Sequence, residues 1–340
     1  MSEIKTILVF CPNWVGDVVM ATPAFTHLRD YYKDARIIAV CRKNVIPVIA
    51  DGPWFNDYVS GQDKTLKGFI ALTKALRVLK PDLAIVFPNS QRAAMLARFS
   101  GAKIVAGYQR NGRGLLLTQG PKPLTKNGKI VWEPMQVYYL KLCRDLGMPV
   151  DFAMKNSLYY GAELKQKADA IFAKHGIKPE DKVVGLIPGA SFGPSKRWSP
   201  VNFGRLATLL EQKFGCRIIM FAAPAETDIA EAVMQHTEAK IVNMLEEKAG
   251  LDLMKPLIAR CNVLITNDTG PRHYGVALDV PQVVVILGST TRNISNDLGN
   301  TTVVCLDLPC APCQQKTCPQ EHHRCMTEIT PEMVLAAVRL

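Results

Sequence analysis

The chain has 340 residues, 48% of them hydrophobic, and a formal net charge of +11, so it is long enough for two domains. No run of about twenty apolar residues is present, which excludes a membrane-spanning helix. The N-terminus lacks the layout of a secretion signal, so we expect a cytoplasmic protein whose ten cysteines stay mostly reduced.

The N-terminal half alternates short apolar runs with amphipathic segments. Strands are predicted at residues 6–10, 36–40, 83–87 and 104–107, and helices at 22–32, 66–79, 90–99 and 135–146. Such alternation is typical of a doubly wound parallel sheet.

The pattern breaks around residues 148–160, which indicates a linker, and a second α/β series follows. Helices are predicted at 162–175, 201–213 and 226–235, strands at 183–187 and 217–221, and two further α/β units end near Gly288. We therefore expect an α/β protein of two doubly wound domains, residues 1–155 and 156–328. A terminal helix in 329–340 could pack back on the N-terminal domain. Because ligands bind beyond the carboxyl ends of parallel strands, a two-substrate transferase with one substrate per domain is the natural interpretation.

Asp17 follows the first predicted strand and stands at the junction between a loop and the helix predicted at 22–32. A carboxylate at the mouth of a cleft could take a proton from an attacking hydroxyl. Asp is also a favoured helix-capping residue, so a structural role is an equal alternative. The segment has no G-x-G-x-x-G, which argues against a dinucleotide site.

Two loops of the second half carry chemistry suited to phosphate. The loop 188–198 follows a strand and offers the hydroxyl of Ser191 and the cation of Lys196. The turn 267–271 leads into a helix, whose unpaired N–H groups and positive dipole end favour an anion such as a diphosphate. There Gly270 permits close backbone approach, and Thr269 could add a donor. An ordinary capped helix is the alternative.

Four segments, NWVGDVVMATPA, FPNSQRAAMLARFSGAKIVAGYQRNGRGLLLT, PGASFGPSKRWS and TNDTGPRHYGVALDVPQVVVILGST, together run through nearly the whole chain. They resemble glycosyltransferase family 9, the lipopolysaccharide heptosyltransferases, and within it most closely the heptosyltransferase II branch. The resemblance implies a GT-B fold, in which two Rossmann-like domains face each other across a cleft. The N-terminal domain would bind the acceptor and the C-terminal domain an ADP-sugar.

The resemblance also implies roles for individual residues. Asp17 falls on the family's general base, and the donor contacts would be Ser191, Lys196, Glu226, Asp268, Thr269, Gly270 and His273. Glu226 would hold the ribose hydroxyls, and the last four match a D-[ST]-G-x-x-H turn. The chain departs from the family at 222–224, at Arg272, where Met is common, and at 243–250. These departures bear on the identity of the donor.

The implied reaction is transfer of L-glycero-D-manno-heptose, with inversion, from ADP-heptose to the heptosyl-Kdo2-lipid A inner core. ADP-heptose is then a co-substrate, and no cofactor and no metal is required. The alternative is another family 9 transferase, such as heptosyltransferase I, a later one, or one with a different nucleotide-sugar donor. A sugar-nucleotide epimerase and a basic adaptor protein are more distant alternatives.

Residues 1–150 carry 21 Lys and Arg against 10 Asp and Glu, whereas the remainder is balanced at 20 against 20. This asymmetry indicates an anionic partner. The resemblance supplies one, the lipopolysaccharide-core acceptor, reached by peripheral contact with the cytoplasmic face of the inner membrane. Lys64, Arg92 and Arg113 are candidate acceptor contacts. No nucleic-acid reader motif or aromatic stacking run is present, so no nucleic-acid partner is expected.

Cys310, Cys313, Cys318 and Cys325 lie within sixteen residues, with His322 and His323 between the last two. Four such ligands could close a zinc site, although the second pair is spaced too widely for a common finger or ribbon. Disulfides are a further alternative. We expect reduced packing cysteines and no metal.

Overall fold

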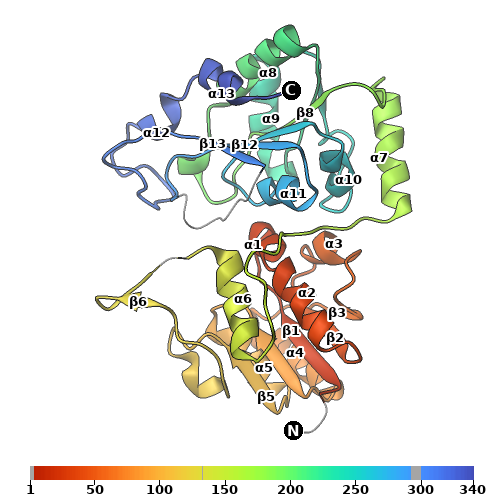
Figure 1. The fold of residues 1–340 in the computed structure, drawn as a ribbon, viewed down its shortest axis with the longest axis vertical. Helices are drawn as coiled ribbons and strands as arrows, with labels where there is room; N and C mark the ends of the chain where they lie inside the picture. Colours follow the sequence, from red (N-terminus) through yellow and green to blue (C-terminus); the bar gives the residue numbers. More distant parts are fainter. Residues whose placement is uncertain (1–3, 132, 292–299) are drawn as a thin grey trace. The chain divides into compact units, whose positions relative to one another are not determined.

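A computed structural model describes residues 4–131, 133–291 and 300–340. The chain divides into two compact units, one formed by the chain up to Asn156 and the other from Ser157 onward. Each unit is built on one parallel sheet flanked by helices, as Figure 1 shows. No helix among these residues is both long and apolar enough to cross a bilayer.

The sheet of the first unit has five parallel strands in the order β3-β2-β1-β4-β5. The strands are β1 (Thr6–Phe10), β2 (Arg36–Val40), β3 (Asp57–Val59), β4 (Leu83–Val86) and β5 (Ile104–Gly107). The helices are α1 (Val15–Met20), α2 (Thr22–Tyr31), α3 (Ile46–Ile49), α4 (Leu66–Val78), α5 (Gln91–Phe99) and α6 (Met135–Asp145). A 3-10 turn, η1 (Arg113–Leu116), and a small hairpin, β6 (Thr125–Lys126) and β7 (Lys129–Ile130), lie between β5 and α6.

In the first unit, side chains on both faces of the central strands are buried, and this burial stabilises the sheet. Every residue of β4 is buried, which is usual for a parallel strand covered on both sides. In register, Ile7 of β1 stands between Ile37 of β2 and Leu83 of β4. Helix α5 begins where the Ser90 hydroxyl accepts from the Ala93 amide. The strand order reverses between β1 and β4, so a ligand crevice is expected at the carboxyl ends of these two strands.

The sheet of the second unit has six parallel strands in the order β10-β9-β8-β11-β12-β13. They are β8 (Val183–Ile187), β9 (Arg217–Met220), β10 (Ile241–Asn243), β11 (Val263–Asn267), β12 (Gln282–Ile286) and β13 (Thr301–Val304). The helices are α7 (Ala162–Lys174), α8 (Pro200–Phe214), α9 (Thr227–Met234), α10 (Met254–Ala259), α11 (Arg272–Ala277), α12 (Arg324–Thr327) and α13 (Pro331–Ala337), with 3-10 turns η2 (Pro194–Lys196) and η3 (Pro224–Glu226). Here the strand order reverses between β8 and β11.

The terminal helix α13 belongs to the second unit and packs on α8 of that unit. Ile329 and Val334 are fully buried in the core cluster that contains Phe203 of α8. The indole Nε1 of Trp198 also donates to the Ile329 carbonyl at 2.8 Å. The apolar side of α13 therefore packs into the hydrophobic core of the second unit.

We expect Val334→Ala to destabilise the second unit by about 2 kcal/mol, because two buried methyl groups are lost and a cavity remains. Met333→Ala is the control, since Met333 lies on the exposed side of the same helix. Urea-induced unfolding of the two variants measures the difference. Equal stability would mean that α13 does not contribute to the core.

Candidate functional site

Two loops of the second unit meet at the carboxyl ends of β8 and β11. Asn267, the last residue of β11, is buried and links them. Its Oδ1 accepts from the Trp198 amide at 3.0 Å, and its Nδ2 donates to the Pro188 carbonyl at 2.6 Å. One amide side chain thus fixes both ends of the loop 188–198 against the turn that follows β11.

The carboxylate of Asp268 gathers two cations and a hydroxyl. Its Oδ2 accepts from Lys196 Nζ at 2.6 Å and from Thr290 Oγ1 at 2.5 Å, and its Oδ1 lies 2.7 Å from Arg272 Nη1. The side chains of Lys196, Asp268 and Arg272 are 14%, 11% and 3% exposed. Among the described residues, two cations face one carboxylate in a site largely removed from water.

The charges of this cluster are fixed by their surroundings. Burial alone would raise the pKa of Asp268, but the charges of Arg272 and Lys196 outweigh it and hold that pKa well below its usual range. His273 is buried beside them, and burial, reinforced by the Arg272 charge, lowers its pKa to about 3. Near neutral pH the carboxylate is therefore ionised and the imidazole neutral.

The turn after β11 offers fewer open amides than the sequence predicted. The N–H of Thr269 donates to Asn267, that of Arg272 to Thr269, and that of His273 to Gly270. In the described part of the chain, the N–H of Gly270 has no hydrogen-bond partner. The first N–H groups of α11 are hydrogen-bonded within the turn and the helix. The positive charge beside Asp268 therefore comes mainly from the side chains of Lys196 and Arg272.

The other two predicted donor residues differ in their placement. The carboxylate of Glu226 lies against Gly189, where an added Cβ would be 2.2 Å from it, so it borders the loop after β8. Its Oε2 accepts from the Ala223 amide at 3.0 Å. Ser191 is exposed and does not join the Asp268 cluster. The buried serine of this loop is Ser195.

Ser195 ties the loop to the cysteine-containing segment. Its hydroxyl donates to the Gln315 carbonyl at 2.5 Å, and its amide donates to the Lys316 carbonyl at 3.1 Å. The ring Nε2 of His323 lies 3.1 Å from the Ser195 carbonyl oxygen. The segment 310–325 is therefore a brace for the loop that carries Lys196, a role that no sequence motif indicated.

The cysteines of this segment are all free thiols. They line a small cavity, whose walls are Ser195, Ser289, Cys310, Ala311, Cys313, Cys318, Pro319, Gln320, His322, His323 and Cys325. Burial raises the pKa of Cys325, and the neighbouring thiols of Cys313, Cys318 and Cys310 add to this. Across residues 4–131, 133–291 and 300–340, no group of three or more His, Cys, Asp or Glu is arranged to hold a metal ion.

In the first unit, Asp17 lies in the first turn of α1, a helix that the sequence did not predict. Asp17 is partly buried, and α1 contacts α6. Burial raises the pKa of Tyr139 on α6 well above its ordinary value, and the Asp17 carboxylate adds to this effect. Asp17 thus follows β1 at the point where the strand order reverses.

Of the three predicted acceptor contacts, Lys64 and Arg92 are exposed, in the loop after β3 and in the first turn of α5. Arg113, the third predicted contact, is fully buried. Its Nε donates to the Tyr108 carbonyl at 2.8 Å and its Nη1 to the Pro88 carbonyl. Burial lowers the pKa of Arg113 to about 10. The guanidinium holds together the loops after β4 and β5.

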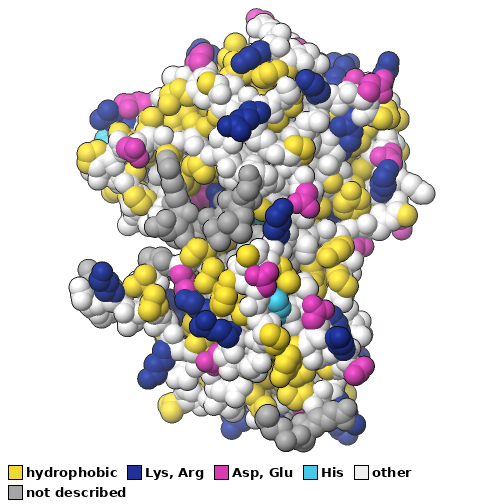
Figure 2. Space-filling view, in the orientation of Figure 1, with side chains coloured by type: hydrophobic (Ala, Val, Ile, Leu, Met, Phe, Trp, Pro, Cys, Tyr) yellow, Lys and Arg dark blue, Asp and Glu magenta, His cyan; other side chains and the backbone are white. Residues whose placement is uncertain are grey.

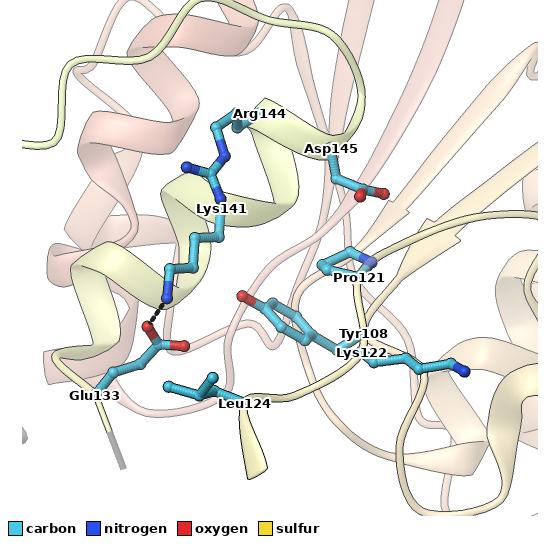
Figure 3. Close-up of a pocket in the computed structure, with 8 residues that line it drawn as sticks. All are labelled: Tyr108, Pro121, Lys122, Leu124, Glu133, Lys141, Arg144 and Asp145. Carbon is cyan, nitrogen blue, oxygen red and sulfur yellow. Dashed lines mark hydrogen bonds and ion pairs between the residues drawn. The ribbon is translucent and has the colours of Figure 1, made fainter. Parts of the chain in front are cut away.

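A cavity of about 390 Å³ lies in the first unit between α6 and the segment before the β6–β7 hairpin (Figure 3). Tyr108, Pro121, Lys122, Leu124, Glu133, Lys141, Arg144 and Asp145 line it. Lys141 is paired with Glu133 there. Figure 2 shows Lys and Arg side chains over the hairpin and α6 on this face of the unit. The lining carries one more cation than anion, and none of the predicted site residues belongs to it.

A family model described as glycosyltransferase family 9 (heptosyltransferase) matches residues 69–324. Lipooligosaccharide heptosyltransferase 2 of Campylobacter jejuni is 28% identical over 97% of this chain and 96% of its own length. The structure of Escherichia coli ADP-heptose LPS heptosyltransferase II is similar, with a TM-score of 0.81, 24% identity and coverage of 98% of this chain and 97% of that one. The E. coli heptosyltransferase WaaC with ADP-2-deoxy-2-fluoro heptose has a TM-score of 0.70, 15% identity and 98% coverage of both chains. The expected GT-B fold class is thereby confirmed.

The buried His273 predicts acid sensitivity. The unfolded imidazole takes up a proton below pH about 6.5, but the folded one does so only near pH 3. The unfolded state therefore binds more protons in this window, and the free energy of unfolding falls as the pH falls, by up to about 1.4 kcal/mol per pH unit. We expect His273→Gln to lose much of this dependence in urea unfolding between pH 7 and 5.

His236→Gln is the matched control, because His236 is exposed at the end of α9. It is expected to keep the acid sensitivity of the wild type. If His273→Gln shows the same pH slope as wild type, His273 is not the group responsible.

Proposed function

The chain belongs to glycosyltransferase family 9, the heptosyltransferases, and on this premise we propose that it transfers heptose from ADP-heptose to the heptosyl-Kdo2-lipid A inner core of lipopolysaccharide. The transfer inverts the anomeric centre. The observation that carries the proposal is the pair of buried cations on Asp268, Lys196 and Arg272, at the carboxyl ends of β8 and β11. Beyond ADP-heptose as co-substrate, the proposal invokes no cofactor.

The proposed binding of the donor rests on the positive charge of Lys196 and Arg272. When the bond from the sugar to ADP breaks, negative charge grows on the departing diphosphate. Cations already held in place before the reaction stabilise that charge more effectively than water, which must reorient. Lys196 and Arg272 are such groups, and the open amide of Gly270 adds a backbone donor. Arg272, where the family commonly has Met, supplies a second cation and so suits a diphosphate.

Glu226 is the proposed contact to the ribose of the donor. Among the described residues only its Oε2 is engaged, by the Ala223 amide, which leaves Oε1 to accept from a ribose hydroxyl. Gly189 contributes by having no side chain, since a Cβ there would occupy the space of this carboxylate. Thr269 and His273 are proposed to shape the turn beside the diphosphate, His273 as a neutral ring.

On the acceptor side, Asp17 is the proposed general base. It takes the proton of the acceptor hydroxyl, whose oxygen attacks the anomeric carbon from the face opposite ADP. Lys64 and Arg92, both exposed, and the cations around the cavity of Figure 3 would meet the anionic groups of the inner core. Such an acceptor implies peripheral contact with the cytoplasmic face of the inner membrane.

Another family 9 transferase is the second candidate, because the chain departs from the family in the segment 243–250. There β10 ends at Asn243, whose Oδ1 accepts from the Leu245 amide at 3.1 Å in a tight turn. A changed loop at this position bears on which nucleotide sugar or acceptor fits.

Defined acceptors test the proposal. With ADP-heptose, we expect the purified protein to release ADP and extend heptosyl-Kdo2-lipid A, but to leave Kdo2-lipid A without heptose unextended. Mass spectrometry of the saccharide and an ADP-release assay measure both outcomes. Extension of Kdo2-lipid A alone would favour heptosyltransferase I, and no transfer to either acceptor would contradict the proposed function.

Asp17→Asn tests the general base. The amide keeps the size of the side chain but cannot accept the proton, so kcat should fall by about 100-fold or more while ADP-heptose still binds with wild-type affinity. Steady-state kinetics and calorimetric titration of ADP-heptose measure the two effects. Asp30→Asn, on the exposed side of α2, is the control and should keep wild-type turnover. Near-normal turnover of Asp17→Asn would remove Asp17 from the mechanism.

A further inference from the structure

Asn89 lies three residues beyond the end of β4, the strand that pairs with β1 where the order of the first sheet reverses. Asp17 follows β1 at the same edge. In open parallel sheets this reversal is where ligands bind. Asn89 is partly exposed, so its side chain is accessible at this edge.

The orientation of the Asn89 amide is determined by its neighbours. Its Oδ1 accepts from Arg113 Nη2 at 2.9 Å and from the Tyr138 hydroxyl at 3.0 Å. A guanidinium can only donate, so the atom that faces it must be the oxygen. The amide nitrogen then faces away from both donors, and within the described residues it has no hydrogen-bond partner. Asn89 therefore presents N–H donors in a fixed direction.

The groups behind Asn89 are rigid. Arg113 is fully buried, and the ring of Tyr138 stacks on Tyr108 with centroids 3.6 Å apart. The Asn89 carbonyl accepts from Asn111 Nδ2 at 2.9 Å. Hydrogen bonds thus fix both the backbone carbonyl and the side-chain oxygen of Asn89. Little conformational entropy therefore remains to be lost when a ligand binds.

Charge next to Asn89 favours an anionic ligand. Arg110 precedes Asn111, whose Nδ2 donates to the Asn89 carbonyl, and among the described residues the buried Nε of Arg110 has no hydrogen-bond partner. Among the described residues neither Arg110 nor Arg113 forms an ion pair with a carboxylate. Two neighbouring guanidinium groups with no acidic partner attract an anion from outside.

We propose that Asn89 and Arg110 bind a carboxylate of the acceptor and so set the acceptor's position at the carboxyl end of β4. A carboxylate has two oxygens in one plane, which suits one amide donor and one guanidinium donor. The inference rests on the proposed function, because the acidic sugars of that acceptor lie next to the heptose that is extended. The lipid phosphates, further along the molecule, share the chemistry and are distinguished by the test.

Asn89→Asp is the decisive variant. It keeps an oxygen for Arg113 and Tyr138, so the fold should be retained, but it replaces the outward N–H donors with a negative oxygen. We expect the KM for heptosyl-Kdo2-lipid A to rise tenfold or more, the KM for ADP-heptose to stay unchanged, and the melting temperature to stay unchanged or rise. Asn127→Asp, at the exposed turn of the β6–β7 hairpin, adds the same charge to the same unit and should leave both KM values unchanged.

Two modified acceptors identify the bound anion. With an acceptor whose Kdo carboxylates are reduced to alcohols, the wild type and Asn89→Asp should have similar KM values, whereas with a dephosphorylated acceptor their tenfold difference should persist. The opposite pattern would assign the site to phosphate and overturn the carboxylate. A wild-type acceptor KM in Asn89→Asp overturns the site itself while the proposed function stands. Absence of transfer by the wild type overturns the proposed function and this assignment with it.

Discussion

The second unit depends on one buried carboxylate, that of Asp268. Moving an ion out of water costs several kcal/mol unless partners replace its hydration, and Asp268 has three: Lys196, Arg272 and Thr290. The partners come from the loop after β8, from α11 and from the segment after β12. The same contacts that stabilise the carboxylate therefore bring two cations to one point, where we propose that the diphosphate of the donor binds.

The two units share a sheet topology and place different polar groups where its strand order reverses. In both, the strand order reverses beside the first strand, and the loops that leave the reversal carry the polar groups. The second unit fills this position with an ionised cluster that is positive overall. The first unit fills it with Asp17 and with Asn89, an amide fixed by the buried Arg113. Fixed positive charge suits a leaving diphosphate, whereas a half-buried carboxylate and neutral amide suit a sugar hydroxyl and its acidic neighbours.

The sequence predicted the elements whose cause is local. The strands of β1, β2, β5 and β8 were predicted within their observed bounds, because buried parallel strands are continuous apolar runs. Short elements, such as α1, α3 and β3, were missed because tertiary contacts and not periodicity stabilise them. The residue types Lys196 and Asp268 pointed to phosphate chemistry, but their ion pair joins positions 72 residues apart, which no spacing predicts.

Buried polar residues were the hardest to predict. The sequence predicts Arg113 as an acceptor contact, since arginine is rarely enclosed, yet in the fold three carbonyl or amide oxygens accept from its guanidinium. The sequence predicts a donor contact at Ser191 and does not single out Ser195, because only the fold shows that Ser195 is buried and Ser191 exposed. Asn89 lies in one of the segments that resemble the family, but nothing in the sequence distinguishes it. Its proposed role depends on the two donors, Arg113 and Tyr138, that orient its amide.

The position of Lys196 depends on the last part of the chain. Its loop is held by Asn267 at both ends, by the carbonyls of Gln315 and Lys316 at Ser195, and by Ile329 through the Trp198 indole. A lysine has four rotatable bonds in its side chain, so an ammonium on a loose loop would spread its charge over many positions. Bracing the backbone on three sides leaves the ion pair with Asp268 to fix the rest. The cysteine-containing segment and the residues before α13 thus matter to the candidate donor site, because they restrict the loop that delivers its cation.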